Sequence, residues 1–259
     1  MSLARTYLFA RASLYKALIL MRRYLFNTVS QLFTGYLFFA LLFFGGQQIA
    51  PTAISESIEG IIIGYFLWML LMSSYSSIAG DITREAQWGT LEQLYMSPLG
   101  IANVVGIKTV VNVTISLLVS SVLLLMMLLT TGTALAIDLL TIVPITVLTL
   151  APAVGLGYVF GGLALLYKRV ENAFRIVQFV FIGLIAAPVD QFPLLKFAPF
   201  SLGSDLLQNA MYFGTPLWEF PVEELAILVG VGAFYLLAGF LAFQRIQYVA
   251  RRRGVLGHY

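Results

Sequence analysis

The sequence predicts an all-α integral membrane protein with six transmembrane helices and both termini in the cytoplasm. Hydrophobic residues make up 60% of its 259 residues and charged residues only 10%, with a mean hydropathy of +0.92. A soluble domain of this size cannot bury so much apolar surface in one core. A bilayer core needs roughly 20 apolar residues per helix, and backbone groups in lipid must be hydrogen-bonded within their own segment, so the long apolar runs favour helices. A transmembrane barrel would instead show alternating segments of about ten residues.

Composition also excludes several kinds of site. The chain has no cysteine, which rules out disulfides and thiolate metal ligands, and its single histidine, His258, leaves little material for a histidine metal site. We therefore expect no metal, no cofactor and no catalytic residue in this chain. The net charge of +3 reflects membrane topology, so no nucleic acid is expected as a partner.

Residues 1–23 are predicted to form an amphipathic helix in the plane of the membrane interface. Its apolar and basic side chains separate onto different sides at helical spacing. The apolar side has Leu3, Tyr7, Leu14, Leu18 and Met21, and the basic side has Arg5, Arg11, Lys16 and Arg22. The alternative is a cytosolic extension of the first span.

Six spans follow, within a single membrane domain over residues 1–259. They are drawn at 24–46, 60–80, 109–131, 139–167, 170–189 and 225–243. The first is too long for a signal-peptide core and should stay in the membrane. The fifth lacks charge only from Ile176 to Val189, and it reaches the needed length if its first turn lies in the interface.

The distribution of basic residues predicts the orientation. All of the 15 lysine and arginine residues except Lys196 fall on one side of these six spans, and cytoplasmic segments retain such residues. The opposite loops are acidic. Both termini are therefore expected in the cytoplasm, with the protein in the plasma membrane and lipids around it.

The segment 81–98, between the second and third spans, is the most polar in the chain. Gly89 interrupts a helix continuing from the second span, Thr90 and Gln93 have the spacing of a capping box, and Pro98 stops the helix. The result is a short helix lying across the inner face of the membrane. Its apolar side, with Leu91 and Leu94, either binds a partner protein or packs under the neighbouring spans.

The outer segment 190–222 contains prolines yet is rich in apolar residues. Between Ser201 and Gly214 it has the pattern of a short amphipathic helix, which would be re-entrant or lie on the outer leaflet before the sixth span. A floppy external loop is the alternative, and the apolar content counts against it.

The inner segment carries a family resemblance. Residues Glu85, Gly89, Thr90, Leu91, Glu92, Leu94, Ser97 and Pro98 resemble the Glu-x-x-x-Gly-Thr-Leu-Glu-x-Leu-x-x-Ser/Thr-Pro signature of ABC-2 type transporter permeases. The outer segment is similar to that family in Pro199-Phe200 followed by Asp205. It departs from the family where Gln208 and Asn209 replace an expected basic residue.

This resemblance implies the transmembrane subunit of an ABC exporter. The inner segment would be a coupling helix that docks on a cytosolic ATPase subunit, present in two copies, which binds ATP and Mg. The coupling residues would be Arg84, Glu85, Gly89, Thr90, Leu91, Glu92, Gln93, Leu94 and Pro98. A second permease copy, in a homodimer, would complete the path on the two-fold axis.

No ionisable residue need lie at the centre of any span, which counts against proton coupling and favours a lipophilic or amphipathic substrate such as a drug, a lipid or a lipid-linked glycan. Candidate path residues are Trp68, Met69, Met72, Ser73, Ser76, Gln178 and Phe179, with helix packing as the alternative for each. Competing functions are a membrane-embedded lipid-modifying enzyme, for which Asp81, Glu85 and Glu92 form the only inner-face acidic cluster, and a channel or secondary transporter.

Overall fold

A computed structural model describes residues 3–88, 96, 100–167 and 171–252, and within these ranges the chain is helical with no strand. The helices are α1 (Leu3–Arg23), α2 (Leu25–Ile49), α3 (Pro51–Gln87), α5 (Ile101–Thr131), α6 (Leu139–Leu166), α7 (Glu171–Ile185), α8 (Ser201–Tyr212) and α9 (Val222–Arg252), with short 3-10 turns η1 (Pro193–Phe197) and η2 (Leu217–Glu219). The predicted all-α class is confirmed for this part of the chain.

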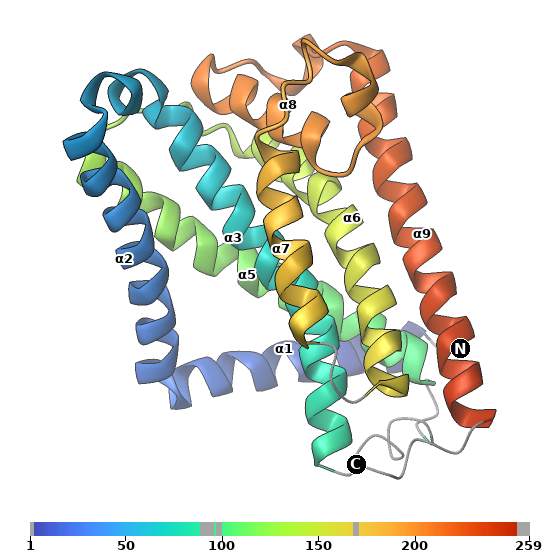
Figure 1. The fold of residues 1–259 in the computed structure, drawn as a ribbon. Coiled ribbons are helices and arrows are strands. Elements are labelled where there is room, and N and C mark those ends of the chain that lie inside the picture. Colours follow the sequence, from blue (N-terminus) through green and yellow to red (C-terminus); the bar gives the residue numbers. More distant parts are fainter. Residues whose placement is uncertain (1–2, 89–95, 97–99, 168–170, 253–259) are drawn as a thin grey trace.

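The long helices run between two ends of one bundle (Figure 1). Helix α1 lies across one end, and α8 lies at the other end. Within the described residues, five helical segments are long and apolar enough to cross a membrane, namely Leu25–Ile49, Ser57–Glu85, Ile101–Thr131, Leu139–Leu166 and Val222–Arg252. The chain is therefore a multi-pass membrane protein.

The predicted fifth span, 170–189, corresponds to the shorter helix α7. With 15 residues, α7 is about 22 Å long, whereas a bilayer core is about 30 Å thick. The sixth crossing thus stays a prediction. Helix α7 ends against α8, whose Ser201 and Ser204 hydroxyls donate hydrogen bonds to the carbonyls of Leu184 (2.8 Å) and Ile185 (2.9 Å). These side chains satisfy acceptors that a helix end leaves without partners.

Two helices extend well beyond the ranges drawn from hydropathy. Helix α3 begins at Pro51, one residue after α2 ends, and continues through Gln87, so the first residues of the segment 81–98 belong to it. Helix α5 begins at Ile101, just after Gly100, which has a φ of +70°. Charged residues end a hydropathy window but do not end a helix, because lysine, arginine and glutamate are good helix formers.

Helix packing is closest between α6 and α9. A Cβ atom on Gly239 would overlap the backbone of Gly155, and one on Gly155 would overlap the carbonyl of Tyr235. Helix α3 packs on another face of α6, where Gly157 and Gly161 lie against Ile78. Small residues let membrane helices approach to this distance, where dispersion contacts hold them together.

Helix α8 is wedged into its end of the bundle. Its first residue follows Phe200, whose φ of 73° is the only positive value among the described non-glycine residues. The Phe200 ring is 2% exposed and lies 4.6 Å from the ring of Phe181 on α7. Burial of the ring holds this strained backbone in place.

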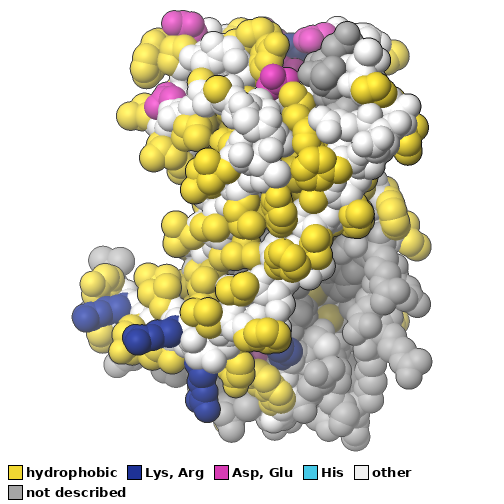
Figure 2. Space-filling model, turned by 90° about the vertical axis from the view of Figure 1, so that its left-hand side faces the viewer, with side chains coloured by type: hydrophobic (Ala, Val, Ile, Leu, Met, Phe, Trp, Pro, Cys, Tyr) yellow, Lys and Arg dark blue, Asp and Glu magenta, His cyan; other side chains and the backbone are white. Residues whose placement is uncertain are grey.

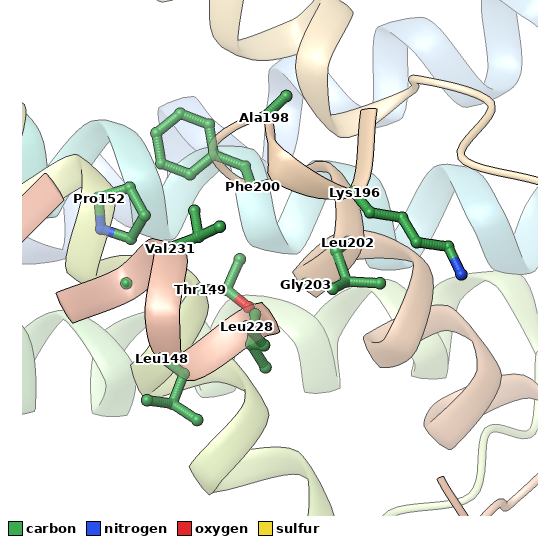
Figure 3. A pocket seen from close by; sticks show the side chains of 11 residues that line it. Leu148, Thr149, Pro152, Lys196, Ala198, Phe200, Leu202, Gly203, Leu228 and Val231 are labelled. Atoms are coloured by element: carbon green, nitrogen blue, oxygen red, sulfur yellow. The ribbon is translucent and has the colours of Figure 1, made fainter. Parts of the chain in front are cut away.

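A small cavity lies where α8 meets α6 and α9 (Figure 3). Its lining is Leu148, Thr149, Pro152, Lys196, Ala198, Phe200, Leu202, Gly203, Leu228, Val231 and Gly232. The volume is about 10 Å³, near the size of one water molecule, and a Cβ atom on Gly203 would overlap Thr149. This cavity is part of the packing of α8 and is too small for a substrate.

Charge divides the two ends of the bundle. Figure 2 shows lysine and arginine side chains at the end with α1, most of the visible acidic side chains at the end with α8, and hydrophobic side chains between them. Helix α9 carries this polarity along its own length, with Glu223 and Glu224 in its first turn and Arg251 and Arg252 in its last.

Candidate functional site

A large cavity opens near the α8 end of the bundle. Its volume is about 900 Å³, in the range of small-molecule sites. It is bounded by α2, α3, α7, α8 and residues 186–191. The lining consists of Phe38, Leu42, Ser57, Gly60, Ile61, Gly64, Tyr65, Trp68, Gln178, Phe179, Ile182, Ile185, Ala186, Ala187, Pro188, Val189, Asp190, Gln191, Asp205 and Gln208.

One wall of this cavity is an aromatic cluster from α2 and α3. The ring of Tyr65 lies 6.4 Å from that of Phe38 and 5.6 Å from that of Trp68. The Tyr65 hydroxyl donates a 2.6 Å hydrogen bond to the carbonyl of Gly35, which fixes the ring. The indole nitrogen of Trp68 is buried and has no hydrogen-bond partner in the described part of the chain.

The opposite end of the cavity is polar and acidic. Asp190, Gln191, Asp205 and Gln208 line it, and Asn209 donates a 3.3 Å hydrogen bond to Asp205. Burial raises the pKa of Asp205 above its ordinary value, and the nearby carboxylates of Asp190 and Glu224 raise it further, whereas Lys196 lowers it. Asp205 is therefore a carboxyl whose charge is not fully balanced by its neighbours.

Three of the predicted path residues line this cavity, namely Trp68, Gln178 and Phe179. The other four, Met69, Met72, Ser73 and Ser76, are not among its lining residues. Ser73 forms a 2.6 Å hydrogen bond with Ser116 on α5, and Ser76 donates to the carbonyl of Met72 at 2.7 Å. Ser73 therefore links α3 to α5, and Ser76 forms a hydrogen bond within α3.

Sequence reasoning missed most of the cavity. Phe38 and Tyr65 face it from α2 and α3, but in the sequence they are two aromatic residues among 33 tyrosine and phenylalanine residues. Among the lining residues outside the predicted path, Asp205 was the one that a sequence pattern marked, because it stands in the family-like pattern that begins at Pro199. The pattern marked the residue without indicating what it faces.

At the other end of the bundle, α3 and α5 are joined by polar contacts. Lys108 Nζ lies 2.7 Å from Glu85 Oε1, and Asn112 donates a 3.0 Å hydrogen bond to Asp81, which also pairs with Arg84. The side chains of Lys108 and Glu85 are only 23% and 15% exposed. We call these four residues of the two helices, Asp81, Glu85, Lys108 and Asn112, the α3–α5 clamp.

The clamp lies at the beginning of the predicted coupling segment 81–98, where the chain is still part of α3. Of the coupling residues, Arg84 is 57% exposed and Glu85 is bound by Lys108. Gly89, Thr90, Leu91, Glu92, Gln93, Leu94 and Pro98 lie outside the described residues. Trp88, the last residue before this stretch, is 67% exposed.

The chain is a multi-pass helical membrane protein with a ligand-sized cavity. It matches the model of the ABC-2 family transporter proteins over residues 46–241, from α2 to α9. The chain therefore belongs to the ABC-2 transporter family and is a transmembrane ABC transporter subunit. A search of curated proteins finds no match.

Proposed function

We propose that this chain is the permease of an exporter for lipophilic or amphipathic compounds, driven by a separate ABC ATPase. The observation that carries the proposal is that one helix, α3, takes part in both candidate sites. It lines the cavity between Ser57 and Trp68 and contributes Asp81 and Glu85 to the clamp. With 37 residues, α3 is about 55 Å long.

This geometry supports a mechanical route from the ATPase to the cavity. The coupling segment 81–98 begins within α3 and ends just before α5, and the clamp ties these two helices together. A force on the segment would therefore move α3 and α5 as a pair and change the cavity at the far end. ATP and Mg in the partner can bias the permease only if the docking contacts differ between its two states.

The charge distribution supports the orientation. The basic end, with α1 and the last turns of α3 and α9, would face the cytoplasm, where the ATPase is. The cavity would then lie toward the outer leaflet of the plasma membrane. Helix α1 would lie in the inner interface, crosswise to the spans.

Two permease copies and two ATPase copies would form the complete transporter. Helices α2, α5 and α7 leave large apolar side chains exposed outside the cavity, including Phe26, Leu129 and Ile176. Lipids and a second copy of the chain would cover these faces, and a closed two-fold arrangement is the common solution for such contacts.

The competing enzyme function loses support in this structure. Of the three acidic residues that could serve it at the inner face, Glu85 is bound by Lys108 and Asp81 by Asn112 and Arg84, and Glu92 lies outside the described residues. A group engaged in this way is poorly placed to transfer a proton to a substrate.

Co-expression with the cognate ABC ATPase tests the proposal. The intact chain is expected to retain the ATPase through purification in detergent, and Glu92→Ala together with Leu94→Ala is expected to release it. The matched control is Glu219→Ala together with Leu194→Ala, since both residues are exposed in the outer segment. Failure of the intact chain to retain the ATPase, or equal retention by both double variants, would contradict the proposal.

A further inference from the structure

The large cavity has an uneven distribution of charge. Among the described residues, its lining includes two carboxylates, Asp190 and Asp205, and no lysine, arginine or histidine. The nearest described cation, Lys196, is held 2.7 Å from Glu224. A ligand with a positive group would thus find unbalanced negative charge, whereas an anionic group would be repelled.

The acidic and aromatic ends of the cavity are separated along α3. Gly60 lies at the acidic end, where a Cβ atom would be 3.6 Å from Gln208 on α8. Trp68 follows Gly60 after eight residues of the same helix, a rise of about 12 Å. The cavity can therefore contact a polar head and a hydrophobic body of one molecule at the same time.

The aromatic end of the cavity suits the apolar body of such a ligand. Phe38, Tyr65 and Trp68 form a continuous cluster, and Phe179 is 74% exposed on the opposite wall. Aromatic side chains offer large apolar surfaces that pack against the rings or chains of a ligand.

We propose that this cavity binds cationic amphiphiles, with the positive group near Asp190 and Asp205 and the apolar body against the aromatic cluster. The inference rests on the proposed function and narrows its substrate class. It excludes anionic cargo such as a phosphate-linked glycan from this site. Burial of Asp205 is consistent with it, because a bound cation would relieve the cost of charging that carboxyl.

A pair of fluorescent probes of similar shape and opposite charge tests the inference. The purified chain in phosphatidylcholine nanodiscs is titrated with trimethylammonium-diphenylhexatriene and with the propionate derivative of diphenylhexatriene, and binding to empty nanodiscs is subtracted. We expect saturable binding of the cationic probe, at least tenfold tighter than that of the anionic probe. Equal affinities, or tighter binding of the anion, would overturn the inference.

Matched variants locate the binding. Asp205→Asn and the more exposed Asp190→Asn are each expected to raise the Kd of the cationic probe about tenfold, whereas Glu219→Gln, an outer carboxylate away from the cavity, should leave it unchanged. Trp68→Leu should raise the Kd about 2- to 12-fold through loss of an aromatic contact with the apolar body, and Trp218→Leu, which is exposed elsewhere, should not. If neither aspartate variant changes the Kd, the cation does not bind here.

This experiment separates the two proposals because it needs no ATPase. A chain that retains its ATPase but does not prefer the cationic probe would keep the proposed function and lose the inference. A chain that prefers the cationic probe through Asp205 but never retains an ATPase would keep the binding site and lose the proposed function.

Discussion

The α3–α5 clamp offers the most direct test of how the two ends of the molecule communicate. The perturbation is Lys108→Glu, which places a carboxylate against Glu85 in a contact now 2.7 Å long. The second perturbation is Glu85→Lys. The third combines both substitutions, which restores an ion pair in which the two charges have exchanged helices. Lys16→Glu on α1 serves as the control, since Lys16 is exposed at the same end of the bundle.

The expected size follows from burial. Exposed ion pairs contribute about 0–1 kcal/mol, and removal of one partner from a fully buried pair costs about 3–5 kcal/mol. With side chains 23% and 15% exposed, the pair lies between these limits, so each single variant should cost about 1–3 kcal/mol. The double variant should recover at least half of the summed loss, which a double-mutant cycle measures.

The assay compares thermal unfolding of the chain with transport-linked ATPase activity of the complex in nanodiscs. Single reversals should keep the ATPase bound but uncouple it, with substrate-stimulated activity falling toward the basal rate, and the double variant should restore stimulation. If single reversals leave stimulation intact while destabilising the chain, the clamp holds the fold without transmitting motion. Additive losses in the double variant would show that the two side chains act independently.

Two further predictions concern packing and pH. Gly239→Ala should destabilise the chain by about 1–3 kcal/mol because the new methyl group overlaps the backbone of Gly155. The control Gly230→Ala, with open space around the new methyl group, should leave stability unchanged or raise it. A lower Tm for both variants would refute the steric argument. The cationic probe should bind most tightly above the pKa of Asp205, where this carboxyl is charged, and more weakly as the pH falls through that pKa. Because the pKa of Asp205 is raised, the loss of binding should occur at a higher pH than an ordinary aspartate with pKa 3.8 would give. Asp190 and Glu224 raise this pKa and Lys196 lowers it. Asp205→Asn should remove that dependence, and an unchanged titration in the variant would assign it to another group.

The accuracy of the sequence predictions varied along the chain for physical reasons. The hydropathy ranges located the helical runs, because lipid forces apolar residues into hydrogen-bonded helices. They missed the extensions of α3 to Gln87 and of α5 back to Ile101, since a helix that leaves the apolar region becomes polar without losing its backbone hydrogen bonds. The amphipathic pattern after Pro199 correctly marked a helix, α8, and its apolar residues Leu206, Leu207 and Met211 are fully buried.

Glycine spacing in the sequence indicates only some of the close helix contacts. Gly157 and Gly161 have the Gly-x-x-x-Gly spacing typical of close helix packing, and both lie at a close contact with α3. The tightest contact, between Gly155 and Gly239, joins residues 84 positions apart, and no local spacing marks it. Which glycine meets which helix depends on how the helices are arranged, so a motif within one helix cannot name the partner.

The sequence alone determined the class of this protein. Its apolar content requires lipid as solvent and hence helices, its charges separate by side, and its inner segment carries a family signature. The tertiary structure decided which side chains meet: Phe38 with Trp68, Asp205 with Asp190, and Lys108 with Glu85. Hydropathy is a property of each residue, so its pattern can be followed along the sequence. A cavity or a clamp depends on the rotation and packing of helices distant in sequence, which only the folded arrangement specifies.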